Sequence, residues 1–156
     1  MKYTLALLAA VQAAKFPDFD SLHANCAMHT LVSSTCDQAY STFQNTLTNF
    51  ADPAGGLYAF VEKDPNMIWV TRTTPVKKYV DDIRWDFFGN PDNFLVSGCK
   101  VTAKSRSRSL SYYDYNTNYC NMWNVFQTVP EAKSLKVETS ECAWIPEDPV
   151  AVCSKY

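Results

Sequence analysis

The apolar positions of this chain recur at helical spacing in its first third. Cys36, Tyr40, Phe43, Leu47 and Phe50 follow one another at steps of four or three residues. This spacing places all five on one face of a helix. The sequence therefore predicts an amphipathic helix that packs this face on the core of the protein.

Both ends of this helix carry recognisable signals. Thr35 precedes Gln38 by three residues, which is the spacing of a capping box. The segment Asp52–Gly56 contains one proline and two glycines. It ends the helical pattern because proline lacks a backbone donor and glycine permits a turn.

The segment before this helix predicts another, shorter one. Asp18 or Asp20 is suited to cap it, and we expect it to run through Leu31. His23 and His29 are two steps of three apart, so on a helix they can gather on one side. They are the chain's two histidines. A hydrolase with a histidine base would have to use one of them.

Beyond Gly56 the pattern changes to that of strands. β-Branched and aromatic residues dominate, and turn residues such as those of Asp64–Asn66 separate the segments. The predicted strands are Leu57–Glu62, Met67–Thr74, Lys78–Phe88 and Phe94–Ser111. Joined by short turns, four such strands form an antiparallel meander.

The third strand alternates between apolar and charged residues, so its two faces differ. One face carries Tyr79, Ile83, Trp85 and Phe87, and the other carries Asp82, Arg84 and Asp86. Pairing through a turn at Gly89–Asn93 places Lys100 of the next strand roughly opposite Asp82, so that acidic and basic outer faces meet. Asp81 is the exception, because it is an acid on the apolar face.

The last third is less regular. Tyr119–Val129 has helical spacing over a short segment, for which periodicity alone leaves helix and strand open. We favour a closing helix that Asn116 or Asn118 caps. Leu135–Trp144 is a candidate fifth strand, and Cys142–Cys153 holds two prolines, which predicts a loop. The predicted fold is α+β, with an N-terminal helix or helices packed on an antiparallel meander of four or five strands.

The first 13 residues have the pattern of a secretory signal peptide. Lys2 is followed by an apolar run from Leu5 to Val11, and small residues at Val11 and Ala13 precede the expected cleavage. The run is too short to span a bilayer. We therefore expect one domain over residues 14–156, secreted or in the lumen of the secretory pathway, without a transmembrane segment.

Six cysteines indicate a disulfide framework. They are Cys26, Cys36, Cys99, Cys120, Cys142 and Cys153. An even number in an exported chain predicts disulfides, and we expect these bonds to tie down the C-terminal tail. The sequence does not choose among the pairings. No two cysteines form a C-x-x-C pair, so the usual zinc and thioredoxin-like motifs are not supported.

The charge balance argues against a nucleic-acid partner. The chain has 14 basic and 16 acidic residues, a formal net charge of −2. Nucleic-acid binding needs a basic surface that releases counterions. The partners that we expect are a small-molecule ligand or other extracellular proteins, and no motif requires a cofactor.

The stretch Ser105–Asn121 has the most unusual composition. Arg106 and Arg108 alternate with serines. In one interpretation they face solvent on a strand whose serines lie under a helix. In the other they clamp an anion, since guanidinium groups bind carboxylate or phosphate bidentately. The clamp fails if Asp82 or Asp86 neutralises them. The tyrosines that follow form a candidate contact surface for a ligand or partner: Tyr112, Tyr113 and Tyr115.

Four residues are predicted to tie this stretch to the neighbouring strand: Asp81, Asp82, Asp114 and Asn118. Asp81 and Asp82 point to opposite faces of a regular strand, so they do not share a proton. A buried Asp81 needs a partner such as Arg106, Ser105 or the amides near Asp114. A catalytic acid with a raised pKa is the alternative role for Asp81.

Asp114, Asn116 and Asn118 have the opening spacing of a calcium loop. Tyr119 replaces the glycine and Val125 the glutamate that an EF-hand requires, which excludes that motif. A looser calcium site is the weaker interpretation. An Asx turn followed by a helix cap at Asn118 is the stronger one, so we predict no metal site.

Two segments, YVDDIRWDF at Tyr79–Phe87 and SRSRSLSYYDYNTN at Ser105–Asn118, are similar to motifs of a widespread domain family of unknown function. Those motifs are F-x-D-D-V-E-F and S-x-S-R-x-G-x-x-D-x-G-x-N. Ser111 and Asn116 stand where the family has glycines, and the arginine is one residue out of register. The resemblance covers residues 36–126, with this chain as a secreted, cysteine-containing variant. It implies a helix, four strands and a closing helix, but no activity.

Three functions follow as hypotheses. The first is a secreted, non-catalytic binding module for a small apolar or anionic ligand, in a cleft lined by aromatic residues. The residues available to line it are Trp69, Trp85, Phe87, Tyr112, Trp123 and Phe126. The second is a structural subunit of an extracellular coat or complex that uses the tyrosines. The third is a hydrolase with His23 or His29. We expect no enzyme, because a G-x-S-x-G elbow is absent.

Overall fold

The computed structural model describes residues 15–89, 98–132 and 137–156. Three predictions fall wholly or partly outside these residues. They are the signal peptide, the turn after Gly89 together with the first residues of the predicted fourth strand, and the first residues of the predicted fifth strand.

The described chain forms one antiparallel sheet and three helices. In chain order the elements are β1 (Asn25–Val32), α1 (Cys36–Thr48), β2 (Leu57–Asp64), β3 (Met67–Thr73), β4 (Val80–Gly89), β5 (Cys99–Ser107), α2 (Thr117–Thr128), β6 (Glu138–Ser140) and α3 (Pro149–Cys153). The strand order in the sheet is β2-β3-β4-β5-β1-β6. The predicted meander of β2 to β5 is confirmed, and β1 and β6 extend it to six strands.

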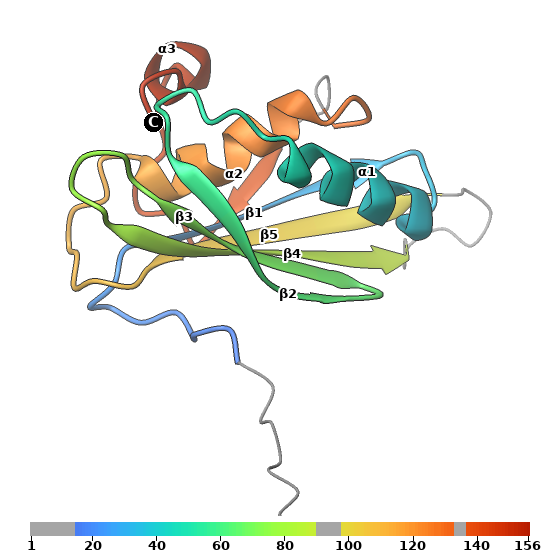
Figure 1. Ribbon diagram of the computed structural model, residues 1–156, viewed down its shortest axis with the longest axis horizontal. Coiled ribbons are helices and arrows are strands. Elements are labelled where there is room, and N and C mark those ends of the chain that lie inside the picture. The colour runs from blue at the N-terminus through green and yellow to red at the C-terminus, as the bar shows by residue number, and fades with distance from the viewer. Residues whose placement is uncertain (1–14, 90–97, 133–136) are drawn as a thin grey trace, which may run out of the picture.

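The helices α1 and α2 cover one face of the sheet, and the N-terminal segment crosses the other (Figure 1). The core lies between the sheet and these helices. Phe43 of α1 packs edge-on against Phe87 of β4 and Phe126 of α2, at ring-centroid distances of 5.4 Å and 5.7 Å. Trp85 is fully buried beside them. The alternation of β4 therefore places its apolar face in the core, as predicted.

The helix α1 begins at the predicted capping box. Thr35 Oγ1 accepts a hydrogen bond from the Gln38 amide at 3.3 Å, and Gln38 Oε1 accepts one from the Thr35 amide at 3.1 Å. These bonds satisfy donors that the first turn of a helix leaves without a partner. The buried residues Ala39, Phe43 and Leu47 form the core-facing side of the helix.

Replacing Thr35 with alanine lowers the free energy of unfolding by about 1 kcal/mol, because the cap of α1 is lost. Ser41→Ala is the matched control, since the Ser41 hydroxyl lies on the exposed surface of the same helix. Urea denaturation of both variants measures the difference. Equal stability of the two variants would contradict a role for this cap.

The helix predicted through Leu31 is wrong, because Asn25–Val32 forms strand β1. This strand pairs with β5 along its whole length, from Asn25 opposite Arg106 to Val32 opposite Cys99. Cys26 and Met28 alternate with less buried residues and face the core. That two-residue alternation suits a strand, and the pairing with β5 satisfies the backbone groups that a helix would have satisfied internally.

The register predicted between β4 and β5 is also wrong. Arg106, and not Lys100, lies opposite Asp82, while Lys100 lies opposite Phe88. The observed register places Trp85 beside the small residue Ala103, and both side chains are fully buried. Core packing therefore decides the register, and the charged residues of the outer face contribute less.

Three disulfides join elements that are distant in sequence. Cys36 at the start of α1 pairs with Cys99 of β5, Cys26 of β1 with Cys142, and Cys120 of α2 with Cys153. The last two bonds tie down the C-terminal tail, as predicted. Such bonds are typical of a compartment that oxidises thiols. None of the helices in the described ranges has the length and apolar character needed to span a bilayer.

The tail has more regular structure than predicted. The short strand Glu138–Ser140 takes the place of the strand predicted over Leu135–Trp144, and the helix Pro149–Cys153 stands inside the predicted loop. Asp148 caps this helix by accepting a hydrogen bond from the Ala151 amide, and Pro149 occupies its first turn, where a missing donor has no cost.

Candidate functional site

A buried polar network lies where β4 and β5 meet the first turns of α2. Asp81 of β4 accepts hydrogen bonds from Ser107 Oγ at 2.8 Å and from Asn121 Nδ2 at 2.9 Å. Ser105 Oγ donates to Asn118 Oδ1 at 2.6 Å. All five residues are buried. The predicted tie between the strand of Asp81 and the following loop thus exists, and it continues into α2.

The partners of Asp81 differ from those predicted. Arg106 lies on the opposite face of the sheet, where it binds Asp20. Ser107 and Asn121 take its place, and Asn121 also donates to Ser105 Oγ at 3.2 Å. Sequence reasoning missed Asn121, although its spacing of three from Asn118 places both amides on one side of a helix.

Asp114 anchors the start of α2. Its carboxylate accepts hydrogen bonds from the Asn118 backbone amide at 3.0 Å and from Asn118 Nδ2 at 2.8 Å. Of the two residues predicted to cap this helix, Asn116 is at the cap and Asn118 is not. Asn116 occupies the cap position without a side-chain hydrogen bond, and Asp114 supplies the acceptor from two residues upstream.

The calcium interpretation of Asp114, Asn116 and Asn118 does not fit this geometry. Asp114 and Asn118 bind each other, and Asn118 Oδ1 also accepts the Ser105 hydroxyl. Among the described residues, no three His, Cys, Asp or Glu side chains form a group suited to a metal ion.

Burial changes the acidity of both carboxyl groups. It raises the pKa of Asp81 above its ordinary value, although hydrogen bonds from Asn121 and Ser107 oppose the shift. Burial also raises the pKa of Asp114 to about 6, against the hydrogen bonds from Asn118, and the nearby Asp81 charge adds to this increase. Such shifts occur both at functional sites and in structural networks.

A pocket of about 360 Å³ opens above this network. Asp81, Asp114 and Ser107 line it from below. Lys77 also lines it, and so do four tyrosines from three parts of the chain: Tyr79, Tyr113, Tyr115 and Tyr156. We call it the tyrosine pocket. It lies at the sheet end that holds both motifs of the family resemblance.

Four aromatic side chains form an exposed ridge beside this pocket. The ring of Tyr113 lies 5.5 Å from that of Tyr112, 6.3 Å from that of Tyr115 and 5.8 Å from that of Trp144. Their exposed fractions are 78% for Tyr112, 59% for Tyr113, 69% for Tyr115 and 40% for Trp144. We call these four residues the tyrosine ridge. Exposed aromatic clusters of this kind mark interaction sites.

The backbone of the tyrosine ridge is strained at two consecutive residues. Tyr115 has a φ of 50° and Asn116 a φ of 67°, in the left-handed region that bulky residues rarely adopt. Asparagine tolerates this conformation, which explains how Asn116 can stand where the similar family has glycine. Tyr115 lacks this tolerance, so its left-handed backbone costs about 1–3 kcal/mol. This strained conformation is the one in which the Tyr115 ring is exposed.

A second pocket, of about 350 Å³, lies on the other side of the ridge. Tyr112 and Trp144 contribute aromatic walls to it, and Asp20, His23 and Asn25 lie among its other lining residues. Ser111 lines both this pocket and the tyrosine pocket, so the ridge separates the two. We call this second cavity the Asp20 pocket.

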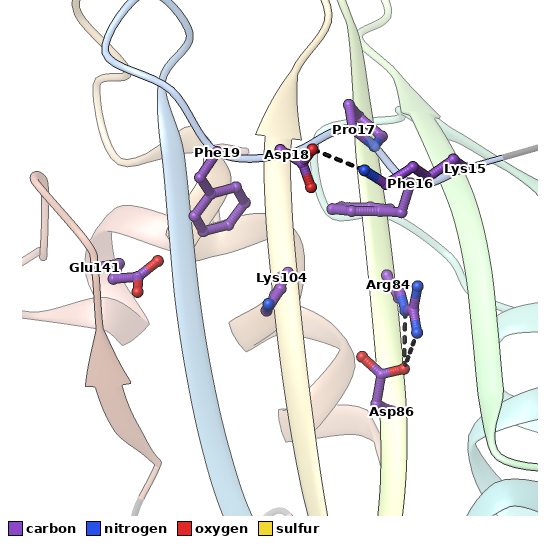
Figure 2. Close-up of a pocket in the computed structure, with 9 residues that line it drawn as sticks. All are labelled: Lys15, Phe16, Pro17, Asp18, Phe19, Arg84, Asp86, Lys104 and Glu141. Atoms are coloured by element: carbon purple, nitrogen blue, oxygen red, sulfur yellow. Dashed lines mark hydrogen bonds and ion pairs between the residues drawn. The ribbon is translucent and has the colours of Figure 1, made fainter.

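A third pocket, of about 270 Å³, lies between the N-terminal segment and the outer face of the sheet (Figure 2). Its charged groups are largely paired with one another. Lys15 binds Asp18 at 2.9 Å, and Arg84 binds Asp86 at 2.6 Å. Phe16 packs against Trp69 in the same region. This contact lets the N-terminal segment cover an apolar part of the outer face.

The proposed anion clamp of Arg106 and Arg108 is not formed. Arg108 makes a bidentate pair with Asp82, with both bonds at 2.8 Å. Arg106 is buried and binds Asp20 at 2.6 Å. Both guanidinium groups are thus neutralised by carboxylates within the protein. Asp82 also accepts a hydrogen bond from the Trp69 indole at 2.9 Å, so it belongs to the outer face and not to the Asp81 network.

The aromatic residues predicted to line a cleft mostly form the core instead. Trp85, Phe87 and Phe126 are at most 2% exposed, and Trp69 is 5% exposed. Trp85, Phe87 and Phe126 pack in the core beneath the helices. Trp69 packs against Phe16 on the outer face of the sheet. Of the predicted lining residues, Tyr112 lines the pocket that also contains Trp144.

The two histidines do not come together as predicted. His23 precedes β1 and its Nδ1 lies 2.8 Å from Asp20. His29 lies within β1, and its Nε2 contacts Glu138 of β6 at 3.2 Å. Cys26, between them in sequence, is in a disulfide. A shared histidine site is therefore excluded.

No family model matches the chain, and no curated protein matches its sequence. The resemblance to a domain family of unknown function thus stays a prediction. Its motif residues nevertheless gather in one place, because Asp81, Ser105, Ser107, Asp114 and Asn118 all belong to the network beneath the tyrosine pocket.

Proposed function

We propose that this protein is a secreted, non-catalytic binding module whose contact surface is the tyrosine ridge. The observation that carries the proposal is the exposure of four neighbouring aromatic side chains, three of them on a strained loop. Such rings gain more from a partner that covers them than from water. The predicted signal peptide and the three disulfides support export.

The network beneath the ridge supports this role by fixing the loop in place. Asp114 binds the first turn of α2, and Asp81 joins α2 to β4 and β5. Cys142, two residues before Trp144, is bonded to Cys26 of β1. The aromatic side chains are therefore presented from restrained backbone, which reduces the entropy that binding must overcome.

The electrostatics disfavour the anionic ligand that the arginines suggested. Both arginines are paired with carboxylates, and the tyrosine pocket contains Asp81 and Asp114 against one basic residue, Lys77. Most of the aromatic residues predicted to line an apolar cleft are buried, which equally disfavours a small apolar ligand. We therefore assign the binding role to the exposed rings and to the polar pockets on either side of them.

The triple variant Tyr112→Ala, Tyr113→Ala, Tyr115→Ala tests the proposal. We expect it to bind the cell-surface fraction of the source organism at least about tenfold more weakly than the unchanged protein, because interface aromatics carry much of the binding energy. Phe88→Ala is the control, since Phe88 is 51% exposed on β4. Unchanged binding by the triple variant would refute the role of the ridge.

Analytical ultracentrifugation of the same proteins separates the binding module from a structural subunit. A coat or complex subunit that uses the ridge would self-associate, and the triple variant would be monomeric. A binding module is monomeric with and without the three tyrosines.

A further inference from the structure

The Asp20 pocket is lined by two aromatic side chains and by a group of polar residues. We call the polar residues its floor; they are Asp20, Ser21, His23 and Asn25. Tyr112 and Trp144 are both exposed and belong to segments far apart in the sequence. Asp20, His23 and Asn25 come from the residues that lead into β1. Its volume of about 350 Å³ lies at the lower end of the range for small-molecule sites, about 300–1,000 Å³.

The floor of the pocket is held rigid by its own hydrogen bonds. Asp20 accepts bonds from the Leu22 and His23 amides at 2.8 Å and 3.0 Å. His23 Nδ1 lies 2.8 Å from Asp20 Oδ1. Asn25 Nδ2 donates to the Asp20 and His23 carbonyl oxygens at 3.2 Å and 3.0 Å. The floor is therefore set before any ligand arrives.

Three polar groups on this floor remain available to a ligand. Within the described part of the chain, no hydrogen bond involves His23 Nε2, Asn25 Oδ1 or the Ser21 hydroxyl. Asn25 Oδ1 accepts, the Ser21 hydroxyl both donates and accepts, and His23 Nε2 does either according to its tautomer. A ligand that offers both donors and acceptors therefore fits the pocket.

The pocket has little free charge to attract an ion. Asp20 is the carboxylate of its lining, and Arg106 binds it at 2.6 Å from below. Hydrogen bonds from His23 and Arg106 lower the pKa of Asp20, so this carboxylate stays ionised and paired. The site therefore favours an uncharged ligand over an anion or a cation.

We infer that the Asp20 pocket binds a neutral pyranose unit of an extracellular glycan. A pyranose ring has an apolar C–H face, which packs on an aromatic ring, and hydroxyl groups around its edge that donate and accept. Tyr112 and Trp144 offer aromatic rings to the apolar face of the sugar. His23, Asn25 and Ser21 offer hydrogen-bond donors and acceptors to its hydroxyl groups. This inference rests on the proposed function, because Tyr112 and Trp144 belong to the tyrosine ridge, and it names the ligand class.

The test uses the full, oxidised protein and a panel of neutral trisaccharides built from glucose, mannose or N-acetylglucosamine. Nuclear magnetic resonance of the ¹⁵N-labelled protein follows the Trp144 indole and the amides of residues 20–25. We expect one of the three sugars to shift these signals at millimolar concentration. In Trp144→Ala the binding should weaken at least about tenfold, and in Phe88→Ala it should not change.

Other outcomes distinguish failure of this inference from failure of the proposed function. If no trisaccharide binds, but the triple tyrosine variant still loses binding to the cell-surface fraction, the glycan inference is wrong and the ridge binds another partner. Sugar binding that survives Trp144→Ala would place the sugar elsewhere and refute the site. If neither sugar binding nor loss of surface binding is observed, both proposals fail.

Discussion

Replacing Arg72 with alanine lowers the free energy of unfolding by about 3–5 kcal/mol, because it leaves a buried carboxylate without its partner. Arg72 of β3 binds Asp52, in the loop after α1, through Nε at 2.5 Å and Nη2 at 3.2 Å. Both side chains are at most 2% exposed. Burial acts to raise the pKa of Asp52, but the hydrogen bond and charge of Arg72 outweigh it and hold that pKa below its ordinary value.

The matched control is Arg84→Ala. Arg84 pairs with Asp86 at 2.6 Å, but its side chain is 35% exposed, and exposed pairs contribute about 0–1 kcal/mol. Urea denaturation of the two variants gives the comparison. A loss at Arg72 as small as that at Arg84 would show that solvent reaches Asp52 and that the pair does not hold the loop to the sheet.

Gly56→Ala provides a second route to the same ion pair. A Cβ atom at Gly56 would lie 2.8 Å from Arg72 Nε and 3.0 Å from Asp52 Oδ2, so the pair would have to move. The substitution should therefore be destabilising even though it removes no charge. Gly89→Ala is its control, because a Cβ atom there meets nothing within 4 Å.

The second large effect is a dependence of stability on pH through Asp114. Burial raises its pKa from 3.8 to about 6 in the folded protein, so the folded state retains this proton more strongly than the unfolded state. Below pH 4 both states are protonated, and above pH 6 both are ionised. As the pH rises from 4 to 6, the free energy of unfolding therefore falls by about 3 kcal/mol from this group.

Other carboxylates act in a different pH range. The pKa values of Asp20 and Asp52 are lowered in the folded state, so their contributions are lost only as the pH falls below about 4. The pKa of Asp81 is raised, like that of Asp114, and its effect adds to the decrease in stability as the pH rises.

Asp114→Asn isolates the contribution of Asp114, because the amide oxygen can still accept the hydrogen bonds from Asn118. Denaturation curves at pH 4, 5, 6 and 7 should show a decrease for the unchanged protein that is about 3 kcal/mol larger than that for the variant. Any constant difference between the two proteins cancels in this comparison. Parallel pH profiles would mean that folding leaves the pKa of Asp114 at its ordinary value.

Periodicity predicted the elements that have one uniform face. The helix α1 and the meander β2 to β5 were identified because their apolar residues repeat at helical or strand spacing over whole elements. The segment Asn25–Val32 was misassigned. It is a strand because it pairs with β5 across the fold, Asn25 lying opposite Arg106. The partner residues lie 67 (99 − 32) to 81 (106 − 25) positions away along the chain, and this distant pairing decides its structure.

The candidate site was predicted in part. The alternation along β4 indicated that Asp81 is a buried acid in need of neutral or cationic partners, and the tyrosines after Arg108 were predicted to form a contact surface. Asn121, Asp20 and Trp144 were not assigned to a site. Asn121 reaches Asp81 across 40 positions and Asp20 reaches Arg106 across 86, and no local pattern records such pairs.

The sequence by itself determined the α+β class, the main helix, the four-strand meander, the burial of Asp81 and the presence of a tyrosine patch. These features follow from local spacing, which sets the faces of helices and strands. Only the tertiary structure decided the register of β5, the disulfide pairing, the neutralisation of Arg106 and Arg108, and the two pockets beside the tyrosine ridge. Each of these depends on which distant side chains share a volume, and that is fixed by close packing of the core.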